Sequence, residues 1–147
     1  LFSVFGIGRK KLSSLTMPWC TYTDPEVAHV GMYEQAQRGI EVETICIPLS
    51  RVDRAIIDGE TAGFAKVHLK KGTDKILGAT IVARHAGEMI GEITLAMTNN
   101  LGLQAIANTI HPYPTQSEVI RQAADEYSLK KLKSFRKLAS TWLAWRR

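Results

Sequence analysis

The alternation of apolar and polar residues is clearest near the middle of the chain. Ala65, Val67 and Leu69 alternate with polar or aromatic neighbours, which is the period of a half-buried β-strand. The tetrapeptide 71–74, with the sequence KGTD, has the composition of a turn, and a mostly apolar run follows at 76–83. This pattern predicts an antiparallel hairpin that buries one face and leaves the other partly polar.

The rest of the chain supplies shorter strands before this hairpin and helices mostly after it. The patterns predict strands at 17–22, 27–30 and 45–49, and helices at 33–38, 86–99, 103–108, 117–127 and 129–145. Strands grouped ahead of helices, without strict β-α alternation, are typical of α+β proteins. We therefore predict an α+β fold in which an antiparallel sheet has helices packed on one face.

Two glycines lie on one face of the helix predicted at 86–99. Gly87 and Gly91 are four residues apart, and a missing side chain allows another backbone to approach closely. Two interpretations stay open from the sequence. The helix either packs tightly within its own domain or meets a second copy of the chain at this face.

The length and composition are those of one globular domain with an extension. The chain has 147 residues, of which 45% are apolar and 22% are charged. It has no run of about 18 apolar residues that would span a membrane. Its first eight residues lack the features of a signal peptide. These observations argue against membrane contact.

Positive charge is concentrated in the segment 128–147. This segment holds seven of the 19 Lys and Arg residues and no acid, whereas the rest has 12 basic residues against 14 acidic ones. Apolar residues recur there at helical spacing, at positions 129, 132, 135, 138, 142 and 143. A basic amphipathic helix is predicted, which packs on its own domain or dimer mate, or binds an anionic surface. The body lacks a basic face, so nucleic acid is not an expected partner.

Cysteine and glycine spacing excludes several kinds of site. Cys20 and Cys46 are the only two cysteines and are far apart, so we predict two separate core thiols and, from them, a reducing cytoplasm. The histidines show no metal-ligand spacing, and no metal site is predicted. The pair Gly6 and Gly8 has no third glycine and no β-α-β setting, so it does not predict a dinucleotide site.

The stretch 111–118, with the sequence HPYPTQSE, is the most unusual in the chain. Its two prolines fix their own φ and keep the preceding residues out of helical conformation. His111 and Tyr113, which precede them, are therefore expected in stiff, extended backbone. On spacing alone, His111 is interpreted as a partly exposed loop histidine.

Glu118 has two interpretations at this point. Thr115 and Glu118 have the spacing of a capping box ahead of an apolar pair, which would satisfy backbone N–H groups at the start of a helix. Alternatively, Glu118 accepts a hydrogen bond from the Tyr113 side chain and orients it, as carboxylates do for many catalytic proton donors.

Several segments together resemble a known family. They are WCTYTDPEVAHVG at 19–31, GFAKV at 63–67, ILGA at 76–79, AGEMI at 86–90 and HPYPTQSE at 111–118. In this order they resemble the carboxyl-terminal dimerisation domain of the pyridine nucleotide-disulphide oxidoreductases. The last of them is similar to the family signature H-x-H-P-T-x-x-E.

The resemblance implies a fold, a partner and cofactors. It implies a homodimer whose signature loop enters the other subunit's active site near the flavin. It implies FAD and NAD(P)H in the full-length cytoplasmic oxidoreductase, held by flavin- and nicotinamide-binding domains of the same protein. No cofactor is expected to bind to this chain alone.

The resemblance also implies the site residues. Tyr113 occupies the position of the family's acid–base histidine, Glu118 that of its carboxylate partner and His111 that of the first histidine. Tyr113 and Pro114 would lie near the partner subunit's flavin. A phenol has a pKa of about 10, so at neutral pH it donates a hydrogen bond and is a poor base. Tyrosine at this position resembles members similar to mercuric reductase, and the substrate is left open.

Three parts are therefore predicted. Residues 1–16 are a linker from a flavin-binding domain, residues 17–127 are the dimerisation domain, and residues 128–147 are the basic amphipathic helix. The alternative is a stand-alone α+β binding module that uses this helix on an acidic partner or a membrane surface.

Overall fold

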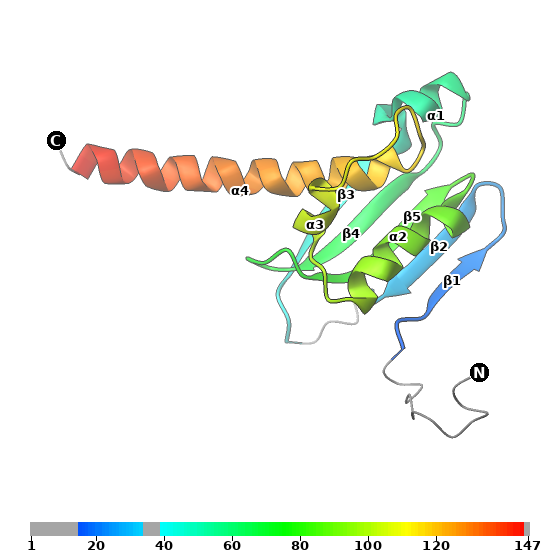
Figure 1. The fold of residues 1–147 in the computed structure, drawn as a ribbon, viewed down its shortest axis with the longest axis horizontal. Helices are drawn as coiled ribbons and strands as arrows, with labels where there is room; N and C mark the ends of the chain where they lie inside the picture. Colours follow the sequence, from blue (N-terminus) through cyan, green and yellow to red (C-terminus); the bar gives the residue numbers. More distant parts are fainter. Residues whose placement is uncertain (1–14, 34–38, 146–147) are drawn as a thin grey trace.

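The computed structural model describes residues 15–33 and 39–145, with side chains described as far as residue 133 (Figure 1). Its elements are β1 (Pro18–Thr21), β2 (Glu26–Gly31), β3 (Val42–Pro48), η3 (Leu49–Arg51), α1 (Asp53–Ile57), β4 (Phe64–Lys70), β5 (Ile76–Ala83), α2 (Ala86–Thr98), α3 (Leu103–Ala107) and α4 (Glu118–Trp145). The strands form one sheet in the order β1-β2-β5-β4-β3, and every neighbouring pair is antiparallel. The predicted strands and the hairpin are confirmed. The helix predicted at 33–38 lies outside the described residues except for its first position.

The register of the sheet places two apolar rows across four strands. One row consists of Ala28, Ile81, Ala65 and Ile47, which are cross-strand neighbours without exposed surface. The next consists of Val30, Ala79, Val67 and Ile45, which are equally buried. Because side chains alternate between the two faces of a strand, both rows lie on the same face. The core of the domain is built against this face.

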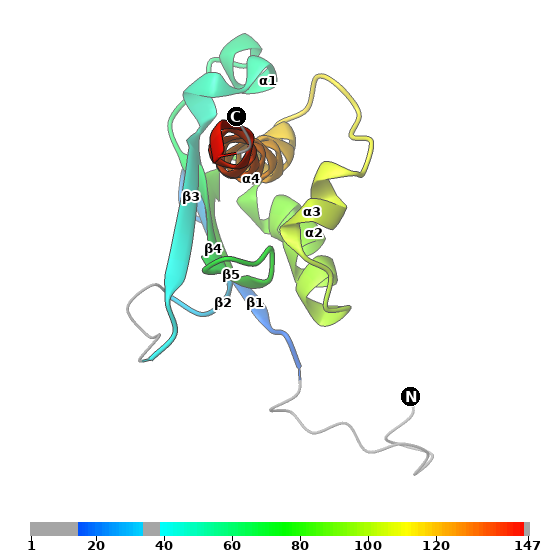
Figure 2. The same cartoon turned by 90° about the vertical axis from the view of Figure 1, so that its left-hand side faces the viewer.

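Helices cover the face that carries these rows. α2 packs against β1, β2 and β5, while α4 packs against β3 and β4, and α3 packs against α4. Figure 2 shows these three helices on one side of the sheet. The predicted arrangement, an antiparallel sheet with helices on one face, is confirmed.

The two cysteines lie in different surroundings. Cys20 is half-buried, but Cys46 is exposed. Cys46 stands between Ile45 and Ile47, which point into the core, so strand alternation turns the thiol to the other face. The prediction of two core thiols is therefore wrong for Cys46.

Gly31 closes the motif TDPEVAHVG in a backbone conformation that few other residues adopt. Its φ is +81°, and an added Cβ would lie 2.5 Å from the carbonyl oxygen of Leu77. The next N–H, that of Met32, donates to the same carbonyl at 2.9 Å. The close approach of two backbones at the end of β2 therefore requires a glycine.

The last helix differs from the prediction. Two helices were expected at 117–127 and 129–145, whereas α4 is one helix of 28 residues that extends beyond the sheet (Figure 1). No glycine or proline interrupts this stretch, and the Ser128 hydroxyl donates to the carbonyl of Ala124 at 3.0 Å. Such a bond to the preceding turn satisfies the hydroxyl inside a continuous helix.

Candidate active-site loop

The loop between α3 and α4 presents Tyr113 at the surface. The Tyr113 side chain is 67% exposed, and the peptide bond that joins it to Pro114 is cis. Its hydroxyl donates a hydrogen bond of 2.6 Å to a carboxylate oxygen of Asp53, in the first turn of α1. The partner of the phenol therefore comes from a segment 60 residues earlier in the chain.

Glu118 does not accept this hydrogen bond. Its Oε1 accepts from the side-chain amide of Gln122 at 3.4 Å, and its Oε2 is buried without a hydrogen-bond partner in the part of the chain that the structure describes. A phenol has one proton to donate, and that of Tyr113 goes to Asp53. The predicted hydrogen bond between Tyr113 and Glu118 is therefore wrong for this chain.

The capping box expected from Thr115 and Glu118 is not formed either. The Glu118 N–H donates to the backbone carbonyl of Thr115 at 3.3 Å. The Thr115 hydroxyl donates to the carbonyl of Pro112 at 3.0 Å and lies 3.0 Å from the hydroxyl of Ser117. Because it bonds within the loop, the threonine side chain stabilises the turn that leads into α4.

His111 fixes the loop to α2. Its side chain is only 8% exposed, and Nε2 lies 2.8 Å from the carboxylate of Glu92. Its Nδ1 lies 3.0 Å from the carbonyl oxygen of Thr109. His111 is thus a loop residue of intermediate exposure, as predicted, and both of its ring nitrogens have oxygen neighbours.

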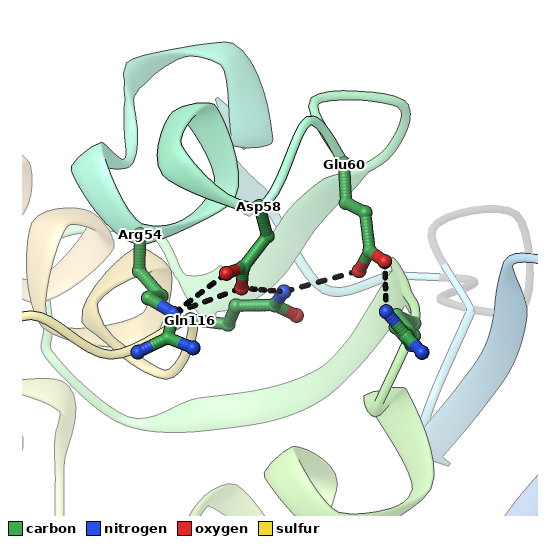
Figure 3. A network of polar contacts seen from close by, with 5 residues as sticks. Arg54, Asp58, Glu60 and Gln116 are labelled. Atoms are coloured by element: carbon green, nitrogen blue, oxygen red, sulfur yellow. Dashed lines mark hydrogen bonds and ion pairs between the residues drawn. The ribbon is translucent and has the colours of Figure 1, made fainter.

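Polar contacts also hold the loop to the segment that contains η3 and α1 (Figure 3). The side-chain amide of Gln116 donates to Asp58 at 3.2 Å and to Glu60 at 3.3 Å. Arg54 donates to both carboxylate oxygens of Asp58 at 2.9 Å, and Arg84 bonds to Glu60. One glutamine thus joins the loop to two ion pairs.

The start of α4 reaches the same segment. The side-chain amide of Gln122 donates to the carbonyl of Arg51 at 3.2 Å, and the Arg51 guanidinium pairs with Glu126 at 3.3 Å. Sequence reasoning missed this segment, because a five-residue helix that buries only Ala55 is too short to give a helical pattern. Asp53 therefore carried no signal as a partner of Tyr113.

The charges around the loop move two pKa values in opposite directions. The hydrogen bond to Asp53, and then its charge, raises the pKa of Tyr113 above the ordinary value, and desolvation and the charge of Glu118 add to this. The hydrogen bond from Arg54 lowers the pKa of Asp58 against the effect of desolvation. At neutral pH the Tyr113 phenol is therefore protonated.

An open cavity lies beside the loop. It has a volume of about 410 Å³, and residues 114–117 form part of its wall. Residues of α1 and the start of α2 complete the wall, with Arg54, Asp58, His85 and Glu88 as its charged or titratable members. Pro114, which was expected near a flavin, lines this cavity.

The part of the chain that the structure describes offers neither a cluster of metal ligands nor a helix that could cross a membrane. No group of three or more His, Cys, Asp or Glu residues there is placed to hold a metal ion. Within the same residues, no helix combines the length and the hydropathy needed to cross a membrane.

Comparisons with known proteins agree with the fold, and the matched residues include those of the loop. The family model described as pyridine nucleotide-disulphide oxidoreductase, dimerisation domain, matches residues 17–124. The chain therefore belongs to this family and is a dimerisation domain of flavin disulphide oxidoreductases. Its relatives are oxidoreductases, and the alternative of a stand-alone binding module finds no support in the comparisons.

Two curated relatives and one solved structure illustrate the match. Dihydrolipoyl dehydrogenase of Mycoplasma pneumoniae is 43% identical over 113 residues, which are 76% of this chain and 25% of that protein. Mercuric reductase of Staphylococcus aureus is 34% identical over 124 residues, 83% of this chain and 23% of that protein. LpdA from Mycobacterium tuberculosis superposes with a TM-score of 0.78 at 28% identity, over 86% of this chain and 28% of that one. The chain thus spans about a quarter of the length of the curated relatives.

Proposed function

We propose that this domain completes the active site of a homodimeric oxidoreductase that depends on FAD and NAD(P)H. Its loop would place Tyr113 beside the flavin of the partner subunit, with Pro114 against the same group. The observation that carries the proposal is an exposed phenol on a loop that is fixed on both sides. His111 ties the loop to α2, and Gln116 ties it to the ion pairs next to α1.

The described residues suit contact with a flavin that other domains hold. Every strand pair is antiparallel, so the described sheet contains no β-α-β unit of the kind that binds a dinucleotide pyrophosphate. The loop offers the exposed Tyr113 side chain and the ring of Pro114 for such a contact. Flavin- and nicotinamide-binding domains of the same protein would bind the cofactors. When bound, the flavin supplies the electron transfer.

The role of Tyr113 follows from its protonation state. The carboxylate of Asp53 raises the pKa of the phenol, so at neutral pH the hydroxyl donates a hydrogen bond and is a poor base. We infer that in the partner's site the hydroxyl exchanges Asp53 for the substrate as the acceptor of this hydrogen bond. Among relatives, this role fits members similar to mercuric reductase, and the proposal names no individual substrate.

Glu118 and His111 would support Tyr113 in different ways. Glu118 contributes its negative charge, which helps to keep the phenol protonated. His111 contributes through Glu92 and the Thr109 carbonyl, which hold the start of the loop in place. Neither residue needs to touch the substrate in this account.

The proposal is tested by Tyr113→Phe in the full-length enzyme. This change removes the hydroxyl and keeps the ring. Because the position is exposed, the change leaves no buried polar group without a partner. We expect kcat to fall on the order of 10²-fold, the loss typical of one proton donor in an active site. Steady-state turnover measured across pH is the readout, with flavin content and dimer mass as controls.

The outcome depends on how the Phe variant compares with the wild type. Equal rates at every pH would mean that Tyr113 serves only packing, and the role proposed for the loop would be wrong. Tyr22→Phe is a matched control, because Tyr22 is also an exposed tyrosine, at 82%, but lies after β1 and outside the loop. It should leave turnover unchanged.

A further inference from the structure

Tyr113 and Asp53 form the shortest hydrogen bond of the loop to another element. The donor and acceptor oxygens are 2.6 Å apart. An O–H···O bond to an ionised carboxylate has this length when it is well formed, and it is about twice as strong as a bond between neutral groups. The bond therefore gives the exposed ring a preferred position.

The backbone of Asp53 is held firmly enough to fix that position. Val52 precedes it and Ala55 follows in the same turn, and neither side chain has exposed surface. The N–H of Ile56 donates to the carbonyl of Val52 at 3.1 Å, which closes the turn around Asp53. The carboxylate thus projects from a turn that Val52 and Ala55 anchor in the core.

Further contacts keep this segment next to the loop. Gln116 donates to Asp58 and Glu60, and Gln122 donates to the carbonyl of Arg51. The first two contacts start in the loop and the third starts in α4, and together they reach both ends of the segment 51–60. The pairing of Tyr113 with Asp53 is therefore one contact of a shared interface between the two segments.

Glu118 is placed less well for the same task. Its Oε1 is engaged by Gln122 and its Oε2 is buried, so neither oxygen receives the Tyr113 hydroxyl. We propose that Asp53 is the positioning residue of this loop, and that its carboxylate, in place of that of Glu118, holds the Tyr113 ring and hydroxyl in place until the substrate replaces it as the hydrogen-bond acceptor. This inference rests on the function proposed above for Tyr113.

A titration of Tyr113 separates the two carboxylates. Asp53 and Glu118 are the charged groups that act on the phenol, and Asp53→Asn and Glu118→Gln remove the same charge from each. The chain has four tyrosines, so labelling of the tyrosine Cζ with ¹³C gives four signals, and Tyr113→Phe assigns the one that matters. The pKa of Tyr113 is then read from this signal in each variant.

We expect Asp53→Asn to lower the pKa of Tyr113 by more than Glu118→Gln does, because only Asp53 accepts the hydrogen bond. An equal or larger shift in Glu118→Gln would overturn the inference. Asp53→Ala repeats the test without an amide that still accepts. The Asp53 side chain is exposed, and melting curves check that each variant is folded.

The same variants test the effect on turnover in the full-length enzyme. A lower phenol pKa removes the proton at lower pH, so the alkaline limb of the kcat profile should move to lower pH in Asp53→Asn. An unmoved limb, in an enzyme that does lose activity in Tyr113→Phe, would contradict the positioning role. If Tyr113→Phe is fully active, the proposed function fails, while the titration still decides which carboxylate holds the phenol.

Discussion

Single polar side chains determine where the candidate active-site loop lies. His111 and Gln116 attach it to elements on either side, and Asp53 holds its exposed phenol. The prolines and the family signature marked Tyr113 from the sequence. The sequence did not indicate Asp53, because Asp53 and Tyr113 are far apart in the chain and meet only through the fold. It instead suggested Glu118 as the acceptor of the Tyr113 hydroxyl. Spacing along the chain also favoured two local pairs, Thr115 with Glu118 and Tyr113 with Glu118, that the structure does not form.

Tyr127 is a second tyrosine whose ionisation depends on the fold, and it gives a prediction for alkaline pH. Its side chain is 6% exposed, and burial raises its pKa, with the charges of Asp74 and Glu43 adding to the effect. The folded state therefore holds the phenol proton more tightly than the unfolded chain, where the pKa is about 10. Its contribution to stability is complete below that pH and is lost as the pH rises through the higher folded value.

The prediction is tested by urea unfolding of wild type and Tyr127→Phe between about pH 9 and 11. The free energy of unfolding of the wild type should fall more steeply with pH than that of the variant, which has no proton to lose. Parallel curves would show that Tyr127 does not contribute to the alkaline loss of stability.

At the scale of elements, α2 has two glycines with different surroundings. An added Cβ at Gly87 would lie 3.0 Å from the Cys20 sulfur, and the Gly87 N–H donates to Glu26 at 3.0 Å. At Gly91 no such atom lies within 4 Å, and Leu95, one turn further on, is 64% exposed. Packing inside the domain therefore accounts for Gly87, whereas Gly91 stays available for a second copy of the chain.

Gly91→Leu should affect self-association, whereas Gly87→Leu should affect the stability of the fold. The first has room in the single chain and improves helix propensity, so folding should persist while self-association weakens at least about tenfold, which corresponds to 1.4 kcal/mol. The second forces a side chain against β1 and should destabilise the fold by about 1–3 kcal/mol. Sedimentation and thermal melting of both variants distinguish these effects. Unchanged association of Gly91→Leu would remove this face of α2 from the proposed interface.

The elements also show which patterns were informative. The strands from 64 to 83 were predicted closely, because apolar and polar residues alternate there over several residues. The helix α2 was predicted closely, because its apolar residues keep helical spacing over several turns. The break predicted within α4 was wrong, since Ser128 bonds to the preceding turn and does not end the helix. The short helix α1 escaped prediction, although it carries Asp53.

At the scale of the whole molecule, the fold class and the family were predictable from the sequence. The ordered motifs from 19 to 118 include residues that the backbone of this sheet requires, such as the glycine at position 31. The domain division at residues 16 and 127 stays a prediction. So does the basic helix at 128–147, which follows the part that the family model matches, residues 17–124.

Self-association of this chain tests the account most directly, because a dimerisation domain should form a two-fold dimer. Sedimentation equilibrium over a wide range of protein concentration gives the mass of the species present. We expect a reversible dimer of twice the 16.3 kDa of one chain, weakened in Gly91→Leu. A single species of 16.3 kDa at every accessible concentration would contradict the account.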